Sequence, residues 1–192
     1  MYKEYAVYQP LQRRGVLDAE SIERLRTSSY FTSNSSIFNE TDFEQLKEMN
    51  PRSAADEKKY QKYLAGQQFV ADVLTILESN RSDHVFMDYG EFEKHLKSLL
   101  GKVEGMSASR LTGIAMVLAV MDKTAVVQKD RKGEIIKDTT TKDTEIIKLT
   151  QDPEKYFEAE VYPHVPDAIW AYEFDPEKKE SATNKEKLGA EF

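Results

Sequence analysis

Residues 107–121 read SASRLTGIAMVLAVM, and this stretch decides how we interpret the fold. Ser107 is a favourable N-cap, because its side-chain oxygen can accept a hydrogen bond from a backbone N–H of the first helical turn. The helix that follows, from Ala108 to Met121, is apolar on nearly every side. A helix of this kind is buried all round, so we expect the most buried element here, with Ile114 and Leu118 in the core.

Caps predict two more helices. Asp18 is a plausible N-cap for a short helix with Ile22 and Leu25 on one face, and Asp88 precedes an amphipathic helix that ends near Gly101. Between them, residues 27–39 are rich in Ser, Thr and Asn and predict a loop.

The segment between residues 41 and 79 predicts a further pair of helices. Thr41 and Glu44 have the spacing of a capping box, in which each side chain satisfies a backbone donor of the other residue. Asn50-Pro51 ends this helix, and Ser53 begins another that runs to about Ser79. Gly66 lies inside this predicted helix, where glycine costs about 1 kcal/mol relative to alanine.

Two segments predict β-structure. Residues 3–9 are rich in β-formers and end at Pro10, which favours a strand. Residues 125–128 and 134–137 flank a short polar loop that contains glycine, a pattern typical of a hairpin. Residues 138–143 are interpreted as a linker.

The C-terminal part predicts one short helix and irregular chain. Asp152 followed by Pro153 indicates a helix start, since proline is favoured at the first helical position, and the helix runs through Glu160. Pro163 and Pro166 stop it. Trp170 is expected to anchor a loop to the core.

The predicted fold class is α+β, predominantly α-helical: a helical bundle with a short N-terminal strand, one β-hairpin and a long irregular C-terminal segment. We divide the chain into four regions. They are an N-terminal strand region (1–17), a helical region (18–121), the hairpin with a proline-rich motif (122–174) and a charged flexible loop or tail (175–192).

Composition excludes several classes of protein. The 192 residues contain no cysteine, which excludes disulfide scaffolds, thiol catalysis and cysteine-based zinc sites and fits a reducing cytoplasm. A net charge of −7 and a pI near 5.2 argue against an autonomous nucleic-acid binder, whose surface would be basic. The sequence has no signal peptide and no apolar run of about 18 residues, so we expect a cytoplasmic protein without a membrane span.

Few residues stand out as candidates for chemistry. His84, His95 and His164 do not have a paired ligand spacing, and His164 with Asp167 alone cannot close a metal site. No metal site is therefore expected. Five basic residues are possible contacts to DNA phosphates, although charged loops of this kind are more often simply solvated: Arg13, Arg14, Lys129, Arg131 and Lys132.

The second half of the chain carries a specific series of motifs. Asp143-Thr144-Glu145 follows Lys142, Tyr156-Phe157 and Glu160-Val161 come next, and Pro163-His164-Val165-Pro166-Asp167-Ala168 precedes Trp170. This series closely resembles the C-terminal region of the modification subunit of type I restriction–modification systems. Residues 187–192 resemble a segment near the end of that family, and residues 5–11 and 18–25 resemble its upstream strand and helix.

The resemblance implies an adenine-specific DNA N6-methyltransferase that uses S-adenosylmethionine. It also implies a complex with a specificity subunit, a restriction subunit and DNA. The glycine-rich cofactor loop and the Asn-Pro-Pro-aromatic motif of the family have no counterpart in this sequence. We therefore expect no catalytic, cofactor-binding or metal-binding residues in the chain itself, and inactivity when it is alone.

The chain is interpreted as a C-terminal segment of the modification subunit, truncated at both ends. Residues 1–17 would then be an edge strand of the catalytic sheet. The implied role is subunit assembly and DNA clamping rather than catalysis, in contact with the catalytic remainder of the subunit and with the specificity subunit. The alternative is a freestanding helical protein-interaction module without nucleic-acid activity.

Overall fold

The computed structural model describes residues 2–148 and 150–172, and the chain divides into two units. The first unit joins residues 1–12 to residues 127–192, and the second spans residues 13–126. The described residues form a mixed α+β structure in which helices predominate, which confirms the predicted fold class. The predicted tail at 175–192 and the motif at 187–192 lie outside the described residues.

The division into units differs from the one that we predicted. The boundaries lie after residues 12 and 126, not after residues 17 and 121, and the two ends of the sequence belong to one unit. The reason is long-range strand pairing, because the N-terminal strand has both of its partners in the C-terminal third of the chain.

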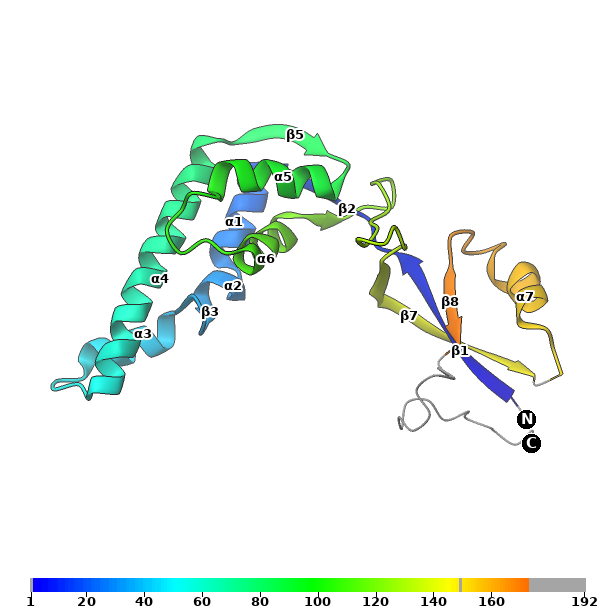
Figure 1. Cartoon of the computed structure of the whole chain (residues 1–192), viewed down its shortest axis with the longest axis horizontal. Helices are drawn as coiled ribbons and strands as arrows, with labels where there is room; N and C mark the ends of the chain where they lie inside the picture. The colour runs from blue at the N-terminus through cyan, green and yellow to red at the C-terminus, as the bar shows by residue number, and fades with distance from the viewer. Residues whose placement is uncertain (1, 149, 173–192) are drawn as a thin grey trace. The chain divides into compact units, whose positions relative to one another are not determined.

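The first unit is a three-stranded antiparallel sheet with a helical segment (Figure 1). Strand β1 (Tyr2–Pro10) lies in the middle, between β7 (Lys137–Lys148) and β8 (Ile169–Tyr172). Between β7 and β8 the chain forms α7 (Pro153–Tyr156), which continues as a π-helical turn, η1 (Phe157–Val161). The predicted cap is confirmed, since the Asp152 side chain accepts a hydrogen bond from the Glu154 N–H at 3.0 Å.

The predicted hairpin is present, but the segment after it is not a linker. Lys129 bridges to Ile135 across a turn in which Gly133 has a φ of 84°. Residues 138–143 belong to β7, where the Asp138 carboxylate accepts hydrogen bonds from the N–H and hydroxyl of Thr140. The polar side chains that indicated a linker thus form hydrogen bonds within an irregular part of β7. This part lies opposite the register shift between Val7 and Gln9 of β1.

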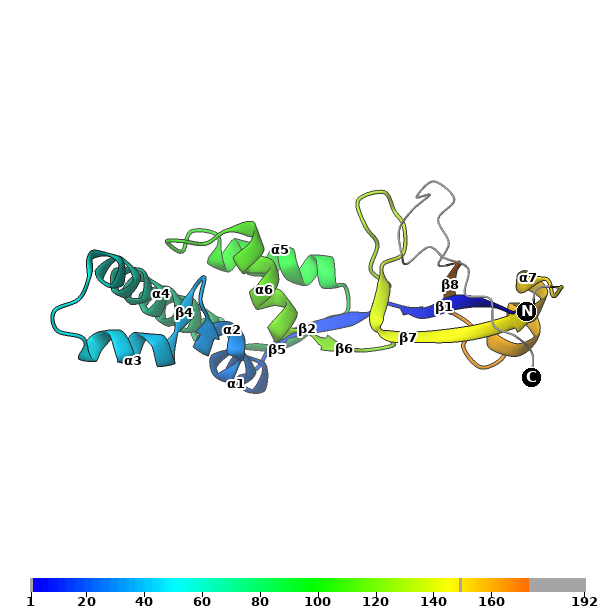
Figure 2. The same cartoon turned by 90° about the horizontal axis from the view of Figure 1, so that it is seen from below.

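The second unit contains most of the helices (Figures 1 and 2), with a main apolar core and a smaller apolar cluster between α3 and α4. Its helices are α1 (Ala19–Thr27), α2 (Ser29–Thr32), α3 (Glu40–Glu48), α4 (Ala54–Ser79), α5 (Tyr89–Leu100) and α6 (Ala108–Leu118). A small antiparallel sheet has the order β5-β2-β6, formed by Ser82–Phe86, Arg13–Leu17 and Val120–Met121. Strands β3 (Ser33–Asn34) and β4 (Phe38–Asn39) pair separately.

Most predicted caps in this unit are confirmed, and two predictions upstream of α4 are wrong. The side chains of Asp18, Ser53, Asp88 and Ser107 all accept hydrogen bonds from first-turn N–H groups. Helix α3, however, is capped by Asn39, which accepts from the Asp42 N–H at 2.9 Å, while Glu44 pairs with Lys47. Residues 27–39 are not simply a loop, because they contain α2 and the β3–β4 pair.

Helix α4 is continuous through Gly66, which confirms the predicted helix from Ala54 to about Ser79. A Cβ atom at this position would lie 1.9 Å from the carbonyl oxygen of Ile37. The glycine therefore allows the backbone before β4 to approach the helix closely, and packing outweighs its low helix propensity.

Helix α6 ends at Leu118, three residues earlier than predicted. Val120 and Met121 pair with β2 instead, and the Arg24 side chain donates hydrogen bonds to the carbonyls of Val117 and Leu118. Ile114 and Leu118 are fully buried, as expected, but Met116 is 50% exposed, so the helix is not buried all round. None of the described helices has the length and hydropathy needed to cross a membrane.

Candidate functional site

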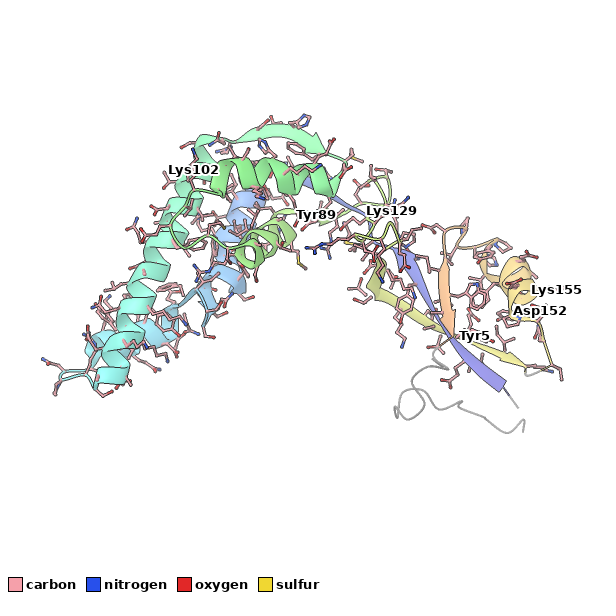
Figure 3. All side chains as sticks on the ribbon, viewed as in Figure 1. Tyr5, Tyr89, Lys102, Lys129, Asp152 and Lys155 are labelled. Carbon is pink, nitrogen blue, oxygen red and sulfur yellow. The ribbon has the colours of Figure 1, made fainter. Side chains whose placement is uncertain are left out.

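Three aromatic side chains form the centre of the first unit. Tyr5 lies on β1, Phe157 begins η1 and Trp170 lies on β8. The rings of Phe157 and Trp170 stack at a centroid distance of 4.9 Å, and Tyr5 meets the two rings edge-on at 6.1 and 5.4 Å. Phe157 is fully buried and Tyr5 is 4% exposed. We call Tyr5, Phe157 and Trp170 the aromatic cluster (Tyr5 is labelled in Figure 3).

A hydrogen bond connects the helical segment to the sheet beside this cluster. The Tyr156 hydroxyl donates to a carboxylate oxygen of Glu145 on β7 at 2.8 Å. This bond, followed by burial, raises the pKa of Tyr156 to about 12. Glu145 is directly opposite Tyr5 in the sheet. The hydrogen bond and the aromatic cluster therefore both attach the helical segment to the sheet at this pair of residues.

The other motif residues of β7 also pair with β1. Asp143 and Thr144 lie opposite Val7 and Ala6, and the Asp143 carboxylate accepts a hydrogen bond from the Thr144 N–H at 2.7 Å. Two segments that the resemblance selected, residues 143–145 and 156–157, are thus brought together with the N-terminal strand. Tyr156 and Glu145 form the hydrogen bond between the two segments, while Asp143 and Thr144 are exposed.

The proline-rich motif forms exposed turns between η1 and β8. The His164 N–H donates to the Val161 carbonyl at 3.0 Å, and the side chains of His164 and Asp167 are exposed. Pro163, Pro166 and Glu160 are exposed as well. Among the described residues, no group of three or more potential metal ligands is found, so His164 and Asp167 have no further ligand to join them.

The basic residues proposed to contact phosphates belong to different units. Arg14 forms an ion pair with Asp122 at 3.0 Å, and the Arg13 guanidinium contacts the Met121 sulfur at 3.5 Å, both in the second unit. Lys129, Arg131 and Lys132 are exposed in the first unit, in the hairpin loop that Asp130 braces through the N–H of Lys132. Figure 3 labels Lys129 at this loop.

The other two histidines contact an aromatic ring. His84 and His95 lie 4.5 and 5.0 Å from Phe86, measured between ring centroids. These contacts fit the structural role that their sequence spacing favours.

Sequence reasoning missed Tyr5 as part of the candidate site. Its signal is weak, because it is one aromatic residue in a short strand, and its ring partners are more than 150 positions away. The apolar run of Tyr5, Ala6 and Val7 was the available clue, and all three residues are buried.

Comparison of the chain with protein-family models, with curated proteins and with solved structures finds no match.

Proposed function

We propose that the chain is an assembly segment of a type I DNA N6-adenine methyltransferase subunit, acting in subunit contacts and DNA clamping rather than in catalysis. One observation carries the proposal. The motif residues of the second half of the chain come together with the N-terminal strand in the first unit, where Tyr5, Glu145, Tyr156, Phe157 and Trp170 stabilise a small sheet and its helical segment. This arrangement supports a structural role for the motif.

The glycines of the second unit do not fit a cofactor cradle. A Cβ atom at Gly15 would lie 2.2 Å from the Phe92 ring, and one at Gly113 would lie 2.4 Å from the Tyr30 ring. These glycines permit close packing within the unit, whereas a phosphate- or cofactor-binding loop leaves its backbone open to a ligand. The proposal therefore places S-adenosylmethionine on the catalytic remainder of the subunit, and no chemical step involves this chain.

Exposed apolar side chains support protein contacts. In the second unit Met116, Met121 and Val126 are each about half exposed. Methionine adapts to irregular partner surfaces, so residues of this kind are favoured where proteins dock. The same observation favours the alternative of a freestanding protein-interaction module, which needs no nucleic acid.

Flanking DNA sequence separates the two candidates. The assembly proposal expects an upstream reading frame with the Asn-Pro-Pro-aromatic motif and a downstream frame for a specificity subunit. The chain should then co-purify with both products when all three are co-expressed. Neighbouring frames without these features would contradict the proposal.

Variants of the exposed turns test the local role. His164→Ala and Asp167→Ala remove exposed side chains, so the fold should persist while assembly with the specificity subunit weakens. Methyl transfer per assembled complex should not change. Glu158→Ala, exposed on the adjacent η1, is the matched control. A variant that assembles normally but loses methyl transfer would show that the turns are catalytic.

A further inference from the structure

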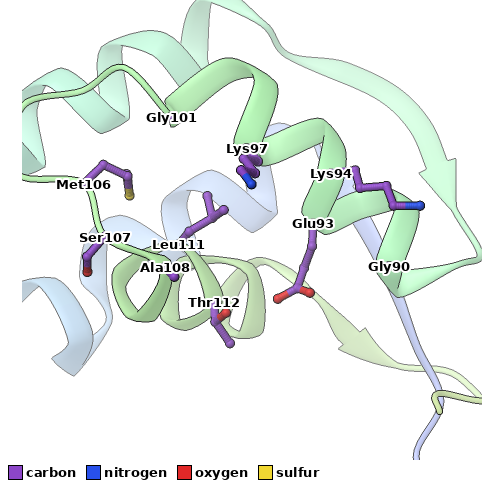
Figure 4. Close-up of a pocket in the computed structure, with 10 residues that line it drawn as sticks. All are labelled: Gly90, Glu93, Lys94, Lys97, Gly101, Met106, Ser107, Ala108, Leu111 and Thr112. Atoms are coloured by element: carbon purple, nitrogen blue, oxygen red, sulfur yellow. The ribbon is translucent and has the colours of Figure 1, made fainter. Parts of the chain in front are cut away.

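A pocket of about 530 Å³ lies between α5 and α6 in the second unit (Figure 4). Its volume is in the range of small-molecule sites. The lower wall is apolar and comes from the start of α6 and the loop before it, through Met106, Ala108 and Leu111. The opposite wall is the polar face of α5, with Glu93, Lys94 and Lys97.

The charged groups on α5 are arranged unevenly. Lys97 and Glu93 both line the pocket from α5, and the Glu93 carboxylate extends toward α6 (Figure 4). Glu93 and Lys97 are four residues apart, the spacing at which a helix favours an ion pair, yet none joins them. Within the described residues, neither Lys97 nor Lys94, which also lines the pocket, has an ion-pair partner. The positive charge of Lys97 above the apolar wall is therefore uncompensated.

Glu93 also affects a buried tyrosine on the same helix. Tyr89 lies one turn earlier on α5, is 8% exposed and has no hydrogen-bond partner for its hydroxyl among the described residues. Burial raises the pKa of Tyr89 to about 12, and the Glu93 carboxylate adds to the shift. Glu93 and Arg13 thus both act electrostatically on the buried Tyr89 hydroxyl, in opposite directions.

A second donor lies at the start of α6. The Ser107 oxygen accepts the capping hydrogen bond from the Arg110 N–H at 3.2 Å, which leaves the hydroxyl hydrogen of Ser107 available. An ammonium group and a hydroxyl at the edge of an apolar wall are complementary to a ligand with an apolar body and one negative group.

We propose that the pocket between α5 and α6 binds a small amphiphilic organic anion. Its apolar ring or chain rests on Met106, Ala108 and Leu111, and its carboxylate or sulfonate meets the Lys97 ammonium and the Ser107 hydroxyl. This site is independent of the proposed assembly role, because it uses none of the residues on which that role rests.

Two fluorescent dyes that differ mainly by a charge test the site on the full chain. 8-Anilino-1-naphthalenesulfonate carries the negative group, and N-phenyl-1-naphthylamine has the same rings without it. Lys97→Gln should weaken binding of the sulfonate about 5–10-fold, as loss of one charge-assisted contact at an exposed position does. Its affinity for the neutral dye should stay within about twofold, because the apolar wall is unchanged.

The controls separate this pocket from general dye binding. Lys58→Gln removes an exposed charge on α4 away from the pocket and should leave both affinities unchanged. Ala108→Phe fills the pocket and should weaken binding of both dyes, with circular dichroism verifying the fold. The absence of saturable sulfonate binding, or equal sulfonate affinity for the wild type and Lys97→Gln, would overturn the proposal. Lys97 is exposed, so Lys97→Gln should fold. The proposal can therefore be refuted with this variant even if Ala108→Phe fails to fold.

Discussion

Replacement of Phe157 by alanine should selectively unfold the first unit. Phe157 is fully buried, stacks on Trp170 at 4.9 Å and meets Tyr5 edge-on. Removing the ring leaves a cavity between η1 and the sheet. Phe-to-Ala changes at such sites cost about 3–5 kcal/mol in the free energy of unfolding, a figure that includes the lost ring contacts.

This cost is large relative to the total stability expected of the unit. At about 0.05–0.15 kcal/mol per residue, the 56 described residues of the unit have roughly 3–8 kcal/mol. The variant should therefore lose at least about a third of the stability of the first unit, and at the lower end of the range the unit would be largely unfolded without denaturant.

Tryptophan emission reports on the first unit alone, since Trp170 is the only tryptophan in the sequence. Urea unfolding of the full chain, followed by emission, should show a much lower midpoint for Phe157→Ala. Far-ultraviolet circular dichroism, dominated by the helices of residues 13–126, should show a transition close to that of the wild type.

Phe157→Leu is the matched control, because it retains much of the apolar volume and should have an intermediate midpoint. A shift of the emission midpoint equivalent to less than about 1 kcal/mol would refute the assignment of Phe157 to the core of the unit. Equal shifts in emission and circular dichroism would refute the independence of the two units.

Three further predictions concern other parts of the chain. Ile114→Ala should cost about 2–5 kcal/mol and shift the circular dichroism melt but not the Trp170 emission transition, because Ile114 is fully buried in the second unit. Gly66→Ala should lower the melting temperature, because its Cβ would lie 1.9 Å from a backbone carbonyl oxygen, whereas Gln67→Ala at the exposed neighbouring position should not. The raised pKa of Tyr156, about 12, stabilises the folded state fully below pH 10, and this contribution is lost as the pH rises toward 12. Absorbance titration at alkaline pH should therefore show that Tyr156→Phe has one tyrosine fewer that ionises near pH 12. An unchanged curve in this pH range would contradict the hydrogen bond to Glu145.

Helix starts were predictable from the sequence because an N-cap is a local interaction. Asp18, Ser53, Asp88, Ser107 and Asp152 each bond to an N–H only two or three residues further along the chain. The donor and the acceptor of an N-cap hydrogen bond both lie within the first turn of the helix, so a short stretch of sequence is enough to predict it. The error at α3 has the same origin, since Asn39 and Thr41 are both good capping residues and only tertiary packing selects between them.

Strands were harder to predict because their partners are distant. Residues 138–143 were interpreted as a linker, and β5 and β8 were not predicted. Strand β1 pairs with residues more than 125 positions away, and an edge strand such as β7 tolerates polar residues on both faces. A strand that is stabilised by backbone pairing rather than by side-chain burial can have a polar sequence. Its local composition then predicts a loop.

The candidate site depends on the same long-range pairing. Tyr5, Phe157 and Trp170 meet only because β1 lies between β7 and β8, so no periodicity within a single segment can select all three. The resemblance covered residues 5–11 as a strand but did not single out Tyr5, whose role follows from the register that places Val7 opposite Trp170 and Tyr5 opposite Glu145. The pocket between α5 and α6 shows the converse: Glu93 and Lys97 have the spacing of an ordinary solvated ion pair, and only packing on α6 places Lys97 above an apolar wall.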